Sequence, residues 1–507
     1  MVQSTVRIIY STIHHYIAKL HSKTSGLYQT TSMTSRWPQS THITATLICS
    51  LLIAASGVVS ASAQDSYTWS SDVIGVDEMQ LNSNYWVERT DEPEQLLKSA
   101  ETIRELNSEA FSNDKHLVKL ELFADQLSAD ELRNRILAVS KPSKSDRYDD
   151  QGILLNAAGY QKLADNLNLQ NIPDTVEIRF ALVVKRADMR SYPTADHYYS
   201  STDSKNLDRF QENGLFPGDA LAVLHQSTDG EWYFVQSYNY PAWVHRQDLA
   251  FGDRDVIEQY KNAAQFLVIT GDKVSTSYNP EVPAISELQL DMGIRVPLLD
   301  PKDLPNDLTN NLNGQNPFAS YIVLLPVRAE DGKLELKPAL IARNKDVHKG
   351  YLPYTRENIT RQAFKFLGER YGWGHSYNAR DCTGFVSEVY KTFGIYMPRN
   401  SGQQGLSDMG ENTRFTQDSS RKDKLEKFKT LDTGDLIYIP GHVMMYIGDV
   451  DDQPYVIHDV SGLSYINENG EYYQGVLNGV SVTPLIPLHL SQETTYVDKV
   501  YNIKKIR

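Results

Sequence analysis

Cysteine is nearly absent from this chain, in which only Cys49 and Cys382 occur among 507 residues. Neither a Cys-x-x-Cys nor a His-Glu-x-x-His motif is present, and these are spacings with which short motifs bind zinc. A glycine-rich phosphate-binding loop is missing as well. We therefore expect no catalytic metal and no other cofactor.

Basic residues are outnumbered by acidic ones, 50 against 64, which gives a net charge of −14. This balance argues against nucleic acid as a partner and against binding to anionic membranes by charge alone. Hydrophobic residues make up 40% of the chain and charged residues 22%, as in globular proteins. The length allows about three or four domains. Separately, we expect the protein to be a monomer.

One apolar run, residues 43–59, is followed directly by Ala61-Ser62-Ala63. This order is typical of a signal-peptide core and its A-x-A cleavage site, so residues 1–63 are predicted to be a signal peptide. A transmembrane anchor is the alternative, but the run is short and small residues follow it at once. The leader is long, and translation from Met33 would give one of ordinary length.

Cleavage after Ala63 would remove Cys49 and leave Cys382 as the only cysteine. The exported protein could then form no internal disulfide, and its hydrophobic cores would have to hold it together. We expect a periplasmic or secreted protein without a stable membrane anchor.

Residues 64–175 are predicted to be a helical N-terminal domain. A second helix is expected to begin after Ser128, because Ser128 and Glu131 have the spacing of a capping box. A first helix is expected from a run of apolar residues that share one face, namely Leu96, Leu97, Ala100, Ile103 and Leu106.

A polar linker follows at residues 141–146. The nearby acidic cluster of Asp146, Asp149 and Asp150 lacks the alternating ligands and the distal glutamate of an EF-hand loop. We interpret it as a solvated turn rather than a calcium site.

Two all-β segments come next, over residues 176–253 and 254–346. Short strands separated by Gly and Pro turns favour small barrels. The interval between Leu299 and Pro317, rich in Asn, Asp and Pro, is predicted to be a surface loop. The expected strands cover residues 176–184, 220–224, 231–236, 321–325 and 333–337.

Residues 347–507 are predicted to form an α+β domain, in which Cys382 starts a helix that Gly394 ends. Strands are expected at residues 435–439, 442–447 and 455–458. A cysteine in the first turn of a helix meets unpaired backbone N–H groups and the positive end of the helix dipole. Both favour a thiolate, which is the reactive form, over a buried inert thiol.

A thiolate nucleophile needs a general base and a group that orients this base. His442 stands at the head of a strand and His458 ends the next one, so the two rings can meet across an antiparallel pair. We predict that His442 is the base and His458 its orienting partner. The other histidines of this part are His375 and His489.

Several blocks in this order resemble the NlpC/p60 family of bacterial cell-wall cysteine peptidases. The resemblance covers about the last 155 residues, and the two all-β segments are similar to the SH3-like domains that precede the peptidase in one branch. It implies a papain-like α+β catalytic domain after two SH3-like barrels and a helical, clip-like N-terminal domain. The matching residues are Tyr371-Gly-Trp-Gly374, Asp381-Cys-Thr-Gly-Phe-Val386, Pro398-Arg-Asn-Ser401, Gln404, Thr433-Gly-Asp-Leu436, Gly441-His442-Val443 and His458.

The resemblance implies hydrolysis of peptidoglycan stem peptides or muropeptides between γ-D-glutamate and the diamino acid, usually meso-diaminopimelate. Cys382 would attack the carbonyl, His442 would act as general base and then acid, and His458 would orient His442. The backbone N–H of Cys382 would contribute to the oxyanion hole.

In the branch with SH3-like domains the enzyme recognises the free amine of an N-terminal L-alanine. Asp381 is placed to bind this ammonium, with Thr383, Ser401 and an aromatic residue, for which Tyr240 is the candidate. The alternatives are an N-cap role for Asp381, an ordinary loop serine and packing of Tyr240 inside its barrel. The walls of the cleft are assigned to Tyr371 and Trp373.

The sequence departs from the family pattern at His375, where a second glycine is usual, and at Asn400, where an acidic residue is common. An amidase that cuts between muramic acid and L-alanine, or an acyltransferase, is the first alternative function. The second is a wall-binding protein with a vestigial peptidase, against which the joint presence of Cys382, His442 and His458 counts.

Overall fold

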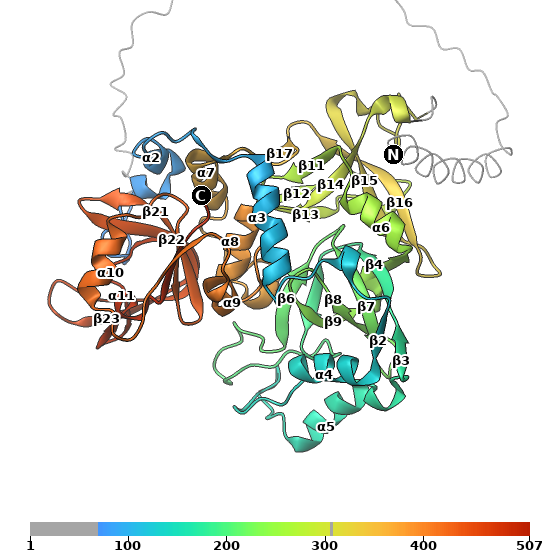
Figure 1. The fold of residues 1–507 in the computed structure, drawn as a ribbon, viewed down its shortest axis with the longest axis horizontal. Helices are drawn as coiled ribbons and strands as arrows, with labels where there is room; N and C mark the ends of the chain where they lie inside the picture. Colours follow the sequence, from blue (N-terminus) through green and yellow to red (C-terminus); the bar gives the residue numbers. More distant parts are fainter. Residues whose placement is uncertain (1–68, 305–307) are drawn as a thin grey trace, which may run out of the picture. The chain divides into compact units, whose positions relative to one another are not determined.

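The computed structural model describes residues 69–304 and 308–507 (Figure 1). The predicted signal peptide, residues 1–63, lies outside the described residues, as does Cys49. Ser70–Arg507 form one compact unit. None of the helices in the described part of the chain has the length and apolar character needed to cross a bilayer.

The first elements pack against the C-terminal part of the chain. They are η1 (Glu78–Leu81), α2 (Ser83–Val87), β1 (Leu96–Lys98) and α3 (Ala100–Asn113). Trp86 is fully buried with its ring 5.3 Å from that of Tyr455, and β1 pairs with β18 (Tyr354–Thr355). Residues 96–97 therefore form a strand, and the helix expected to include them begins only after the N-cap Ser99.

The next helices add to the core of the sheet that follows them. They are α4 (Ala129–Val139) and α5 (Ala157–Asn166). Leu132 and Ile136 of α4 belong to the same buried cluster as Trp243 of that sheet. A separate helical domain over residues 64–175 is not confirmed, since Leu132 and Ile136 of α4 pack in the core of the following sheet and short strands occur among the described helices.

The start of α4 follows half of the predicted capping pattern. The Ser128 hydroxyl accepts a hydrogen bond from the backbone N–H of Glu131 at 3.3 Å, and Leu127 and Leu132 are buried beside it. The Glu131 carboxylate pairs with Arg135 at 2.8 Å instead of bonding back to Ser128. One side chain thus caps the helix.

A seven-stranded antiparallel sheet has the strand order β10-β4-β7-β8-β9-β5-β6. The strands predicted at residues 176–184, 220–224 and 231–236 correspond to β4, β7 and β8. A separate pair consists of β2 (Gln126–Ser128) and β3 (Thr175–Glu177). The seven strands are β4 (Arg179–Val183), β5 (Ala187–Arg190), β6 (Gln211–Leu215), β7 (Ala220–Gln226), β8 (Trp232–Gln236), β9 (Pro241–His245) and β10 (Leu249–Gly252).

A five-stranded sheet has the order β16-β15-β14-β11-β17. The strands predicted at residues 321–325 and 333–337 correspond to β15 and β16. The interval predicted as a surface loop carries two buried leucines, Leu304 and Leu312, which pack with Ile322 and Leu340. The interval therefore has a small core of its own. The strands are β11 (Phe266–Ile269), β14 (Arg295–Leu299), β15 (Ser320–Arg328), β16 (Leu334–Ala342) and β17 (Val347–Lys349), beside the pair β12 (Lys273–Ser275) and β13 (Gln289–Asp291).

The C-terminal part is built on a six-stranded sheet with the order β19-β26-β20-β21-β22-β23. Helix α8 (Cys382–Lys391) packs on β21 and β22, and the three predicted strands correspond to β20, β21 and β22. The strands are β19 (Glu411–Arg414), β20 (Leu436–Ile439), β21 (His442–Val450), β22 (Gln453–Ile466), β23 (Tyr472–Pro484) and β26 (Asn502–Lys505). The other helices are α7 (Arg356–Phe364), α9 (Ser401–Leu406), α10 (Arg421–Phe428) and α11 (Tyr496–Lys499).

Short elements connect these layers, and helix α6 (Arg254–Lys261) joins the first two sheets. In Figure 1 helix α3 lies between these sheets and the C-terminal helices. The remaining elements are η2 (Leu120–Leu122), η3 (Leu169–Asn171), η4 (Arg246–Asp248), η5 (Pro283–Ile285), η6 (Pro301–Asp303), η7 (Pro317–Ala319), η8 (Trp373–Asn378), β24 (His489–Ser491) and β25 (Thr494–Thr495).

Candidate active site

Cys382 is the first residue of α8, as the sequence predicts, and Asp381 is the N-cap. The backbone N–H of Val443, the residue after His442, faces the sulfur. Burial raises the pKa of the Cys382 thiol to about 12, and the Asp381 carboxylate adds to this effect. The expectation that the helix start would favour a thiolate is therefore wrong for the resting structure, because burial outweighs the helix N-terminus.

The two predicted histidines meet across neighbouring strands. His442 Nε2 lies 2.8 Å from His458 Nδ1, and His458 Nε2 lies 3.0 Å from the Thr483 hydroxyl oxygen on β23. Burial lowers the pKa of His442 to about 4 and that of His458 well below its ordinary value, so both rings are neutral at pH 7. The three side chains form a continuous chain that leaves His442 Nδ1 free for the thiol.

No hydrogen bond joins Cys382 to His442 in the described part of the chain. Both nevertheless lie near Tyr496 of α11, whose ring centre is 6.3 Å from that of His442 and whose phenol is influenced by the Cys382 charge. Catalytic hydrogen bonds are often long without substrate and tighten on binding. The arrangement suits a nucleophile and base that align when the cleft is filled.

Asp381 is saturated by protein donors. Its Oδ1 accepts hydrogen bonds from the Gly384 N–H at 2.9 Å and the Thr383 hydroxyl at 2.9 Å, and its Oδ2 accepts one from the Gly374 N–H at 3.1 Å. Arg399 binds both oxygens, at 3.2 and 2.6 Å. Burial alone would raise the pKa of Asp381, but Arg399 holds it well below its usual range. The side chain is thus both an N-cap and a buried ion-pair partner.

Thr383 shares this buried network. Its hydroxyl donates to Asp381 and accepts from Arg399 Nη1 at 2.6 Å. Arg399 Nε donates to Asn213 Oδ1 of β6 at 2.6 Å, so the first sheet reaches the acid beside the nucleophile. Arg399 lies inside the block Pro398-Arg-Asn-Ser401, but the sequence analysis gave it no role. Nothing in the sequence around Asn213 indicates its contact with Arg399.

Tyr240 forms a second polar cluster with a carboxylate that the sequence analysis missed. Its hydroxyl donates to Glu212 Oε2 of β6 at 2.6 Å. Burial raises the pKa of Glu212, although the Tyr240 hydrogen bond and Arg399 oppose the shift. Glu212 Oε1 and the hydroxyl of the half-buried Ser401 have no hydrogen-bond partner among the described residues. Tyr240 also lies close to Asn400, next to Ser401.

The two predicted wall residues differ in their surroundings. Burial raises the pKa of Tyr371, and the charges of Cys382 and Asp381 add to the shift, so this phenol lies near the nucleophile. Trp373 instead docks on the first sheet, where its indole N–H donates to the Gln211 carbonyl at 3.0 Å. The guanidinium group of Arg209 lies 4.8 Å from the centre of the Trp373 ring.

His375, the departure from the glycine pattern, adopts a left-handed backbone with φ of 70°. Its Nε2–H donates to Glu388 Oε1 at 3.0 Å, and its Nδ1 accepts from the Gly214 N–H at 3.3 Å. Burial lowers its pKa to about 4, in keeping with this neutral tautomer. The two hydrogen bonds of the imidazole join α8 to β6 and offset the cost of the strained backbone.

Beneath α8 lies a network of buried ion pairs that the sequence analysis did not foresee. Arg380, fully buried, pairs with Glu388 at 2.9 Å, with Asp291 of β13 at 3.3 Å, and with Glu369. Arg186, in the loop between β4 and β5, pairs with Asp291 at 2.5 Å. This loop and the β12-β13 pair thereby fix the residue that precedes the Asp381-Cys382 pair.

The described residues contain no group of three or more His, Cys, Asp or Glu side chains that could hold a metal ion. In the acidic turn, Asp149 Oδ1 accepts the backbone N–H groups of Gln151 at 2.9 Å and Ile153 at 2.8 Å. Asp150 accepts the hydroxyl of Tyr199 at 3.0 Å. These bonds are those of a polar turn.

Residues 368–482 match the profile of the NlpC/P60 family. These residues form an NlpC/P60 domain. Cys382, His442 and His458 all lie inside the NlpC/P60 match. A second profile, described as an SH3 domain of the SH3b1 type, matches residues 197–245 within the seven-stranded sheet.

Two curated relatives resemble about half of this chain. A γ-D-glutamyl-L-lysine dipeptidyl-peptidase from Bacillus cereus is 26% identical over 268 residues, which cover 48% of this chain and 66% of the relative. The chain thus spans just under two thirds of that relative's length. Dipeptidyl-peptidase 6 from Lysinibacillus sphaericus is 23% identical over 250 residues, which cover 48% of this chain and 78% of the relative.

A solved structure, described as a novel NlpC/P60 endopeptidase from Photobacterium damselae subsp. piscicida, superposes with a TM-score of 0.63. The superposition covers 81% of this chain and 94% of that one at 19% identity. At this identity the likeness shows a shared fold, which extends beyond the NlpC/P60 domain into the preceding sheets.

Proposed function

We propose that this protein is a cysteine peptidase that hydrolyses the bond between γ-D-glutamate and the diamino acid of peptidoglycan stem peptides. The proposal rests on one observation above all: Cys382 begins a helix beside the buried chain of His442, His458 and Thr483. The NlpC/P60 domain and the name of the Bacillus cereus relative support the same substrate class.

The hydrogen-bond chain can run in only one direction if His442 is the base. His442 Nδ1 must hold a lone pair for the thiol proton, so its Nε2–H donates to His458 Nδ1. His458 Nε2–H then donates to the Thr483 hydroxyl. In the reverse direction Nδ1 would carry a proton and could accept none.

Catalysis begins when the thiol proton of Cys382 moves to His442 and the sulfur attacks the γ-carbonyl carbon of D-glutamate. The backbone N–H of Cys382, which is free of helical partners at this position, stabilises the oxyanion. The imidazolium returns its proton to the leaving amine of the diamino acid. Water then cleaves the thioester with His442 again acting as base.

We assign the free amine of the N-terminal L-alanine to the space beside Glu212, Tyr240 and Ser401. Among the described residues, one oxygen of Glu212 and the hydroxyl of Ser401 have no hydrogen-bond partner, whereas Asp381 and Thr383 are saturated. The Asp381 carboxylate therefore acts by holding Arg399. Burial disfavours the charged form of Glu212, and an ammonium group beside it would stabilise that form.

Recognition of a free L-alanine amine would exclude the amidase, because that amine is acylated in an amidase substrate. We further propose that both sheets are SH3-like domains that narrow the cleft, so that small free-ended muropeptides are preferred over intact wall. The contact of Asn213 with Arg399 supports such a wall. The enzyme would act as a monomer outside the cytoplasm, without nucleic acid or metal.

Mass spectrometry of the products from synthetic stem peptides tests this function. The substrates are L-Ala-γ-D-Glu-meso-diaminopimelate-D-Ala, its L-lysine counterpart and the N-acetylated form of each. We expect release of L-Ala-D-Glu from a free-amine peptide and none from the acetylated peptides, and no product with Cys382→Ala. Cleavage at the L-Ala bond, or equal cleavage of the acetylated forms, would overturn the assignment.

A further inference from the structure

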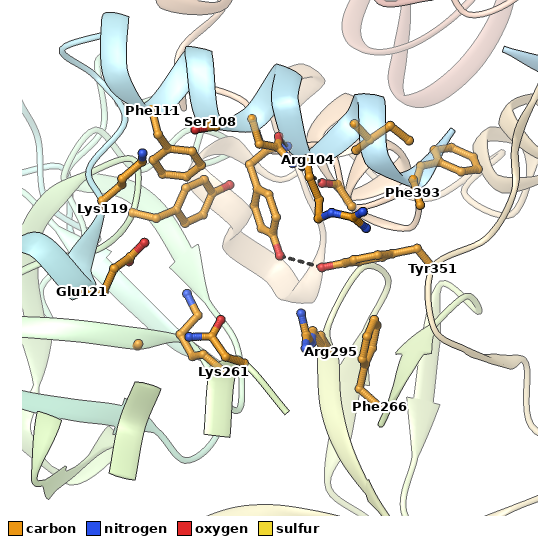
Figure 2. Close-up of a pocket in the computed structure, with 18 of the residues that line it drawn as sticks. Arg104, Ser108, Phe111, Lys119, Glu121, Lys261, Phe266, Arg295, Tyr351 and Phe393 are labelled. Atoms are coloured by element: carbon orange, nitrogen blue, oxygen red, sulfur yellow. Dashed lines mark hydrogen bonds between the residues drawn. The ribbon is translucent and has the colours of Figure 1, made fainter. Parts of the chain in front are cut away.

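A large cavity lies apart from the catalytic residues, between α3, α6, β14 and the loops around Tyr351 and Phe393 (Figure 2). Its volume is about 1000 Å³, at the upper end of the range of small-molecule sites. Neither Cys382 nor His442 lines it. The cavity is therefore a space distinct from the active site.

Aromatic side chains form one wall of this cavity. The Tyr351 and Tyr396 hydroxyls are 3.1 Å apart, and the ring of Tyr351 lies 5.0 Å from that of Phe266. The rings of Tyr238 and Tyr396 are 5.5 Å apart. Contacts among these rings hold the wall in place, so it presents a preformed apolar surface with hydroxyl groups.

The cavity is rich in cations, although the chain as a whole carries a net charge of −14. Acidic side chains of the lining are Glu121 and Glu258. The lining has these basic residues: Lys98, Arg104, Lys119, Arg254, Lys261 and Arg295. This local excess of positive charge favours an anion in the cavity.

Some of these cations are paired within the protein. Arg254 pairs with Asp125 at 2.9 Å. Arg295 donates to the Ala263 carbonyl at 2.5 Å, and its guanidinium lies 3.8 Å from the centre of the Phe266 ring. These contacts fix Arg295 while its positive charge remains without a carboxylate.

Arg104 and Lys261 have no hydrogen-bond or ion-pair partner among the described residues. Lys261 is exposed and lines the cavity, and the acidic charges that act on it are those of Asp219 and Glu121. Figure 2 shows Arg104, Lys261 and Arg295 reaching into the same space from α3, α6 and β14. Arg104 is exposed as well, so an anion between these side chains would gain charge-assisted hydrogen bonds without displacing a carboxylate that is bonded to either of them.

We propose that this cavity binds a small organic anion that bears two or more carboxylate or phosphate groups on an apolar body. The acidic groups would lie between Arg104, Lys261 and Arg295, and the body would lie against Tyr351 and Tyr396. The site is independent of the hydrolase assignment, because it shares no residue with the proposed catalytic chain.

Isothermal titration calorimetry on the full-length Cys382→Ala protein tests the site. The first probe is the N-acetylated stem tetrapeptide, which carries carboxylates and alanine methyl groups and lacks the amine that the catalytic pocket is proposed to need. The second is the same peptide with its carboxylates amidated. The third is inorganic phosphate. Saturable binding of the acidic peptide, or of phosphate alone, supports the proposal and shows which anion is preferred.

Lys261→Met and Arg104→Met should each weaken this binding by about tenfold or more, the effect of losing one charged hydrogen bond. Lys261→Arg should retain it, and Lys422→Met, at an exposed lysine of α10, should leave it unchanged. Thermal melting checks that each variant is folded. No binding of either anion, equal binding of the amidated peptide, or binding unaffected by Lys261→Met and Arg104→Met would overturn the proposal. Hydrolysis by the wild-type protein is scored separately.

Discussion

At the scale of single residues, Cys382 keeps its proton in the resting protein because burial and the Asp381 carboxylate both oppose a thiolate. Thiolate formation is then coupled to the proton transfer to His442, and the enzyme avoids a reactive sulfur without substrate. The sequence predicted that Cys382 starts a helix, which the structure has, but the resting charge predicted from this position is wrong, because the helix-start pattern says nothing about how deeply the sulfur is buried.

Alkylation kinetics test this charge. Iodoacetamide should modify Cys382 more slowly than free cysteine at about pH 8, and the rate should keep rising above about pH 9, where an ordinary thiol levels off. Asp381→Asn keeps an N-cap and removes the negative charge, so it should accelerate alkylation by about tenfold and lower kcat/KM by loosening Arg399. Asp408→Asn, at an exposed carboxylate paired with Arg414, is the matched control. A rate that levels off near pH 8.5 would contradict the raised pKa.

The acid limb of the pH profile reports on His442. The base must be neutral to act, and burial lowers its pKa from 6.5 to about 4, so the neutral form persists well below pH 6.5. We expect kcat/KM for the stem peptide to fall only as the pH approaches about 4. The apparent pKa of this fall belongs to the hydrogen-bonded His442–His458 pair and not to one ring alone. Circular dichroism over the same range separates titration from unfolding. A limb centred near pH 6.5 would argue for a solvated His442.

At the scale of elements, three adjacent strands build the proposed proton-transfer chain. His442 begins β21, His458 lies in β22, and Thr483 lies in β23, where it pairs with Val456 two residues before His458. Antiparallel register brings such diagonal neighbours within reach. The two histidines could be predicted because His442 stands at the head of an apolar strand and His458 follows a short apolar run, although β22 continues beyond His458 to Ile466. Thr483 could not be, since its role depends on a register that only the folded sheet defines.

Thr483→Val tests the end of this chain. The substitution preserves the shape and removes the acceptor, so His458 Nε2–H is left buried without a partner, at a cost of about 1–3 kcal/mol. We expect kcat to fall by about 10- to 100-fold with little change in KM, because the orientation of His442 is affected rather than substrate binding. Thr413→Val on the edge strand β19 is the control. A kcat equal to that of the wild-type protein would remove Thr483 from the mechanism.

At the scale of the whole molecule, the seven-stranded sheet and the β12-β13 pair contact the candidate active site. Asn213 is 186 residues from Arg399 in the chain, and Asp291 is 89 residues from Arg380. Neither contact leaves a local trace in the sequence, and Glu212 escaped notice for the same reason. Domain order could be inferred from the resemblance, whereas the residues that cross between domains depend on how they pack.

Asp291→Asn tests this scaffold. The side chain is fully buried between Arg186 and Arg380, so removal of its charge leaves two buried guanidinium groups short of a partner. We expect a loss of about 3–5 kcal/mol in the free energy of unfolding, measured by urea titration, and a lower kcat/KM because Arg380 precedes the Asp381-Cys382 pair. Asp272→Asn, directly before β12 of the same strand pair, should have little effect. An unchanged unfolding midpoint would show that the network does not hold the sheets to α8.

The central claim is that the Cys382 sulfur attacks the γ-carbonyl of D-glutamate in a peptide with a free L-alanine amine. The most direct measurement is peptide mapping by mass spectrometry after treatment with a chloromethyl ketone of L-Ala-γ-D-Glu. The account predicts modification of Cys382 alone, slowed by N-acetylation of the reagent and by His442→Ala. Modification at another residue, or an enzyme that cleaves the stem peptide yet remains unmodified, would contradict it.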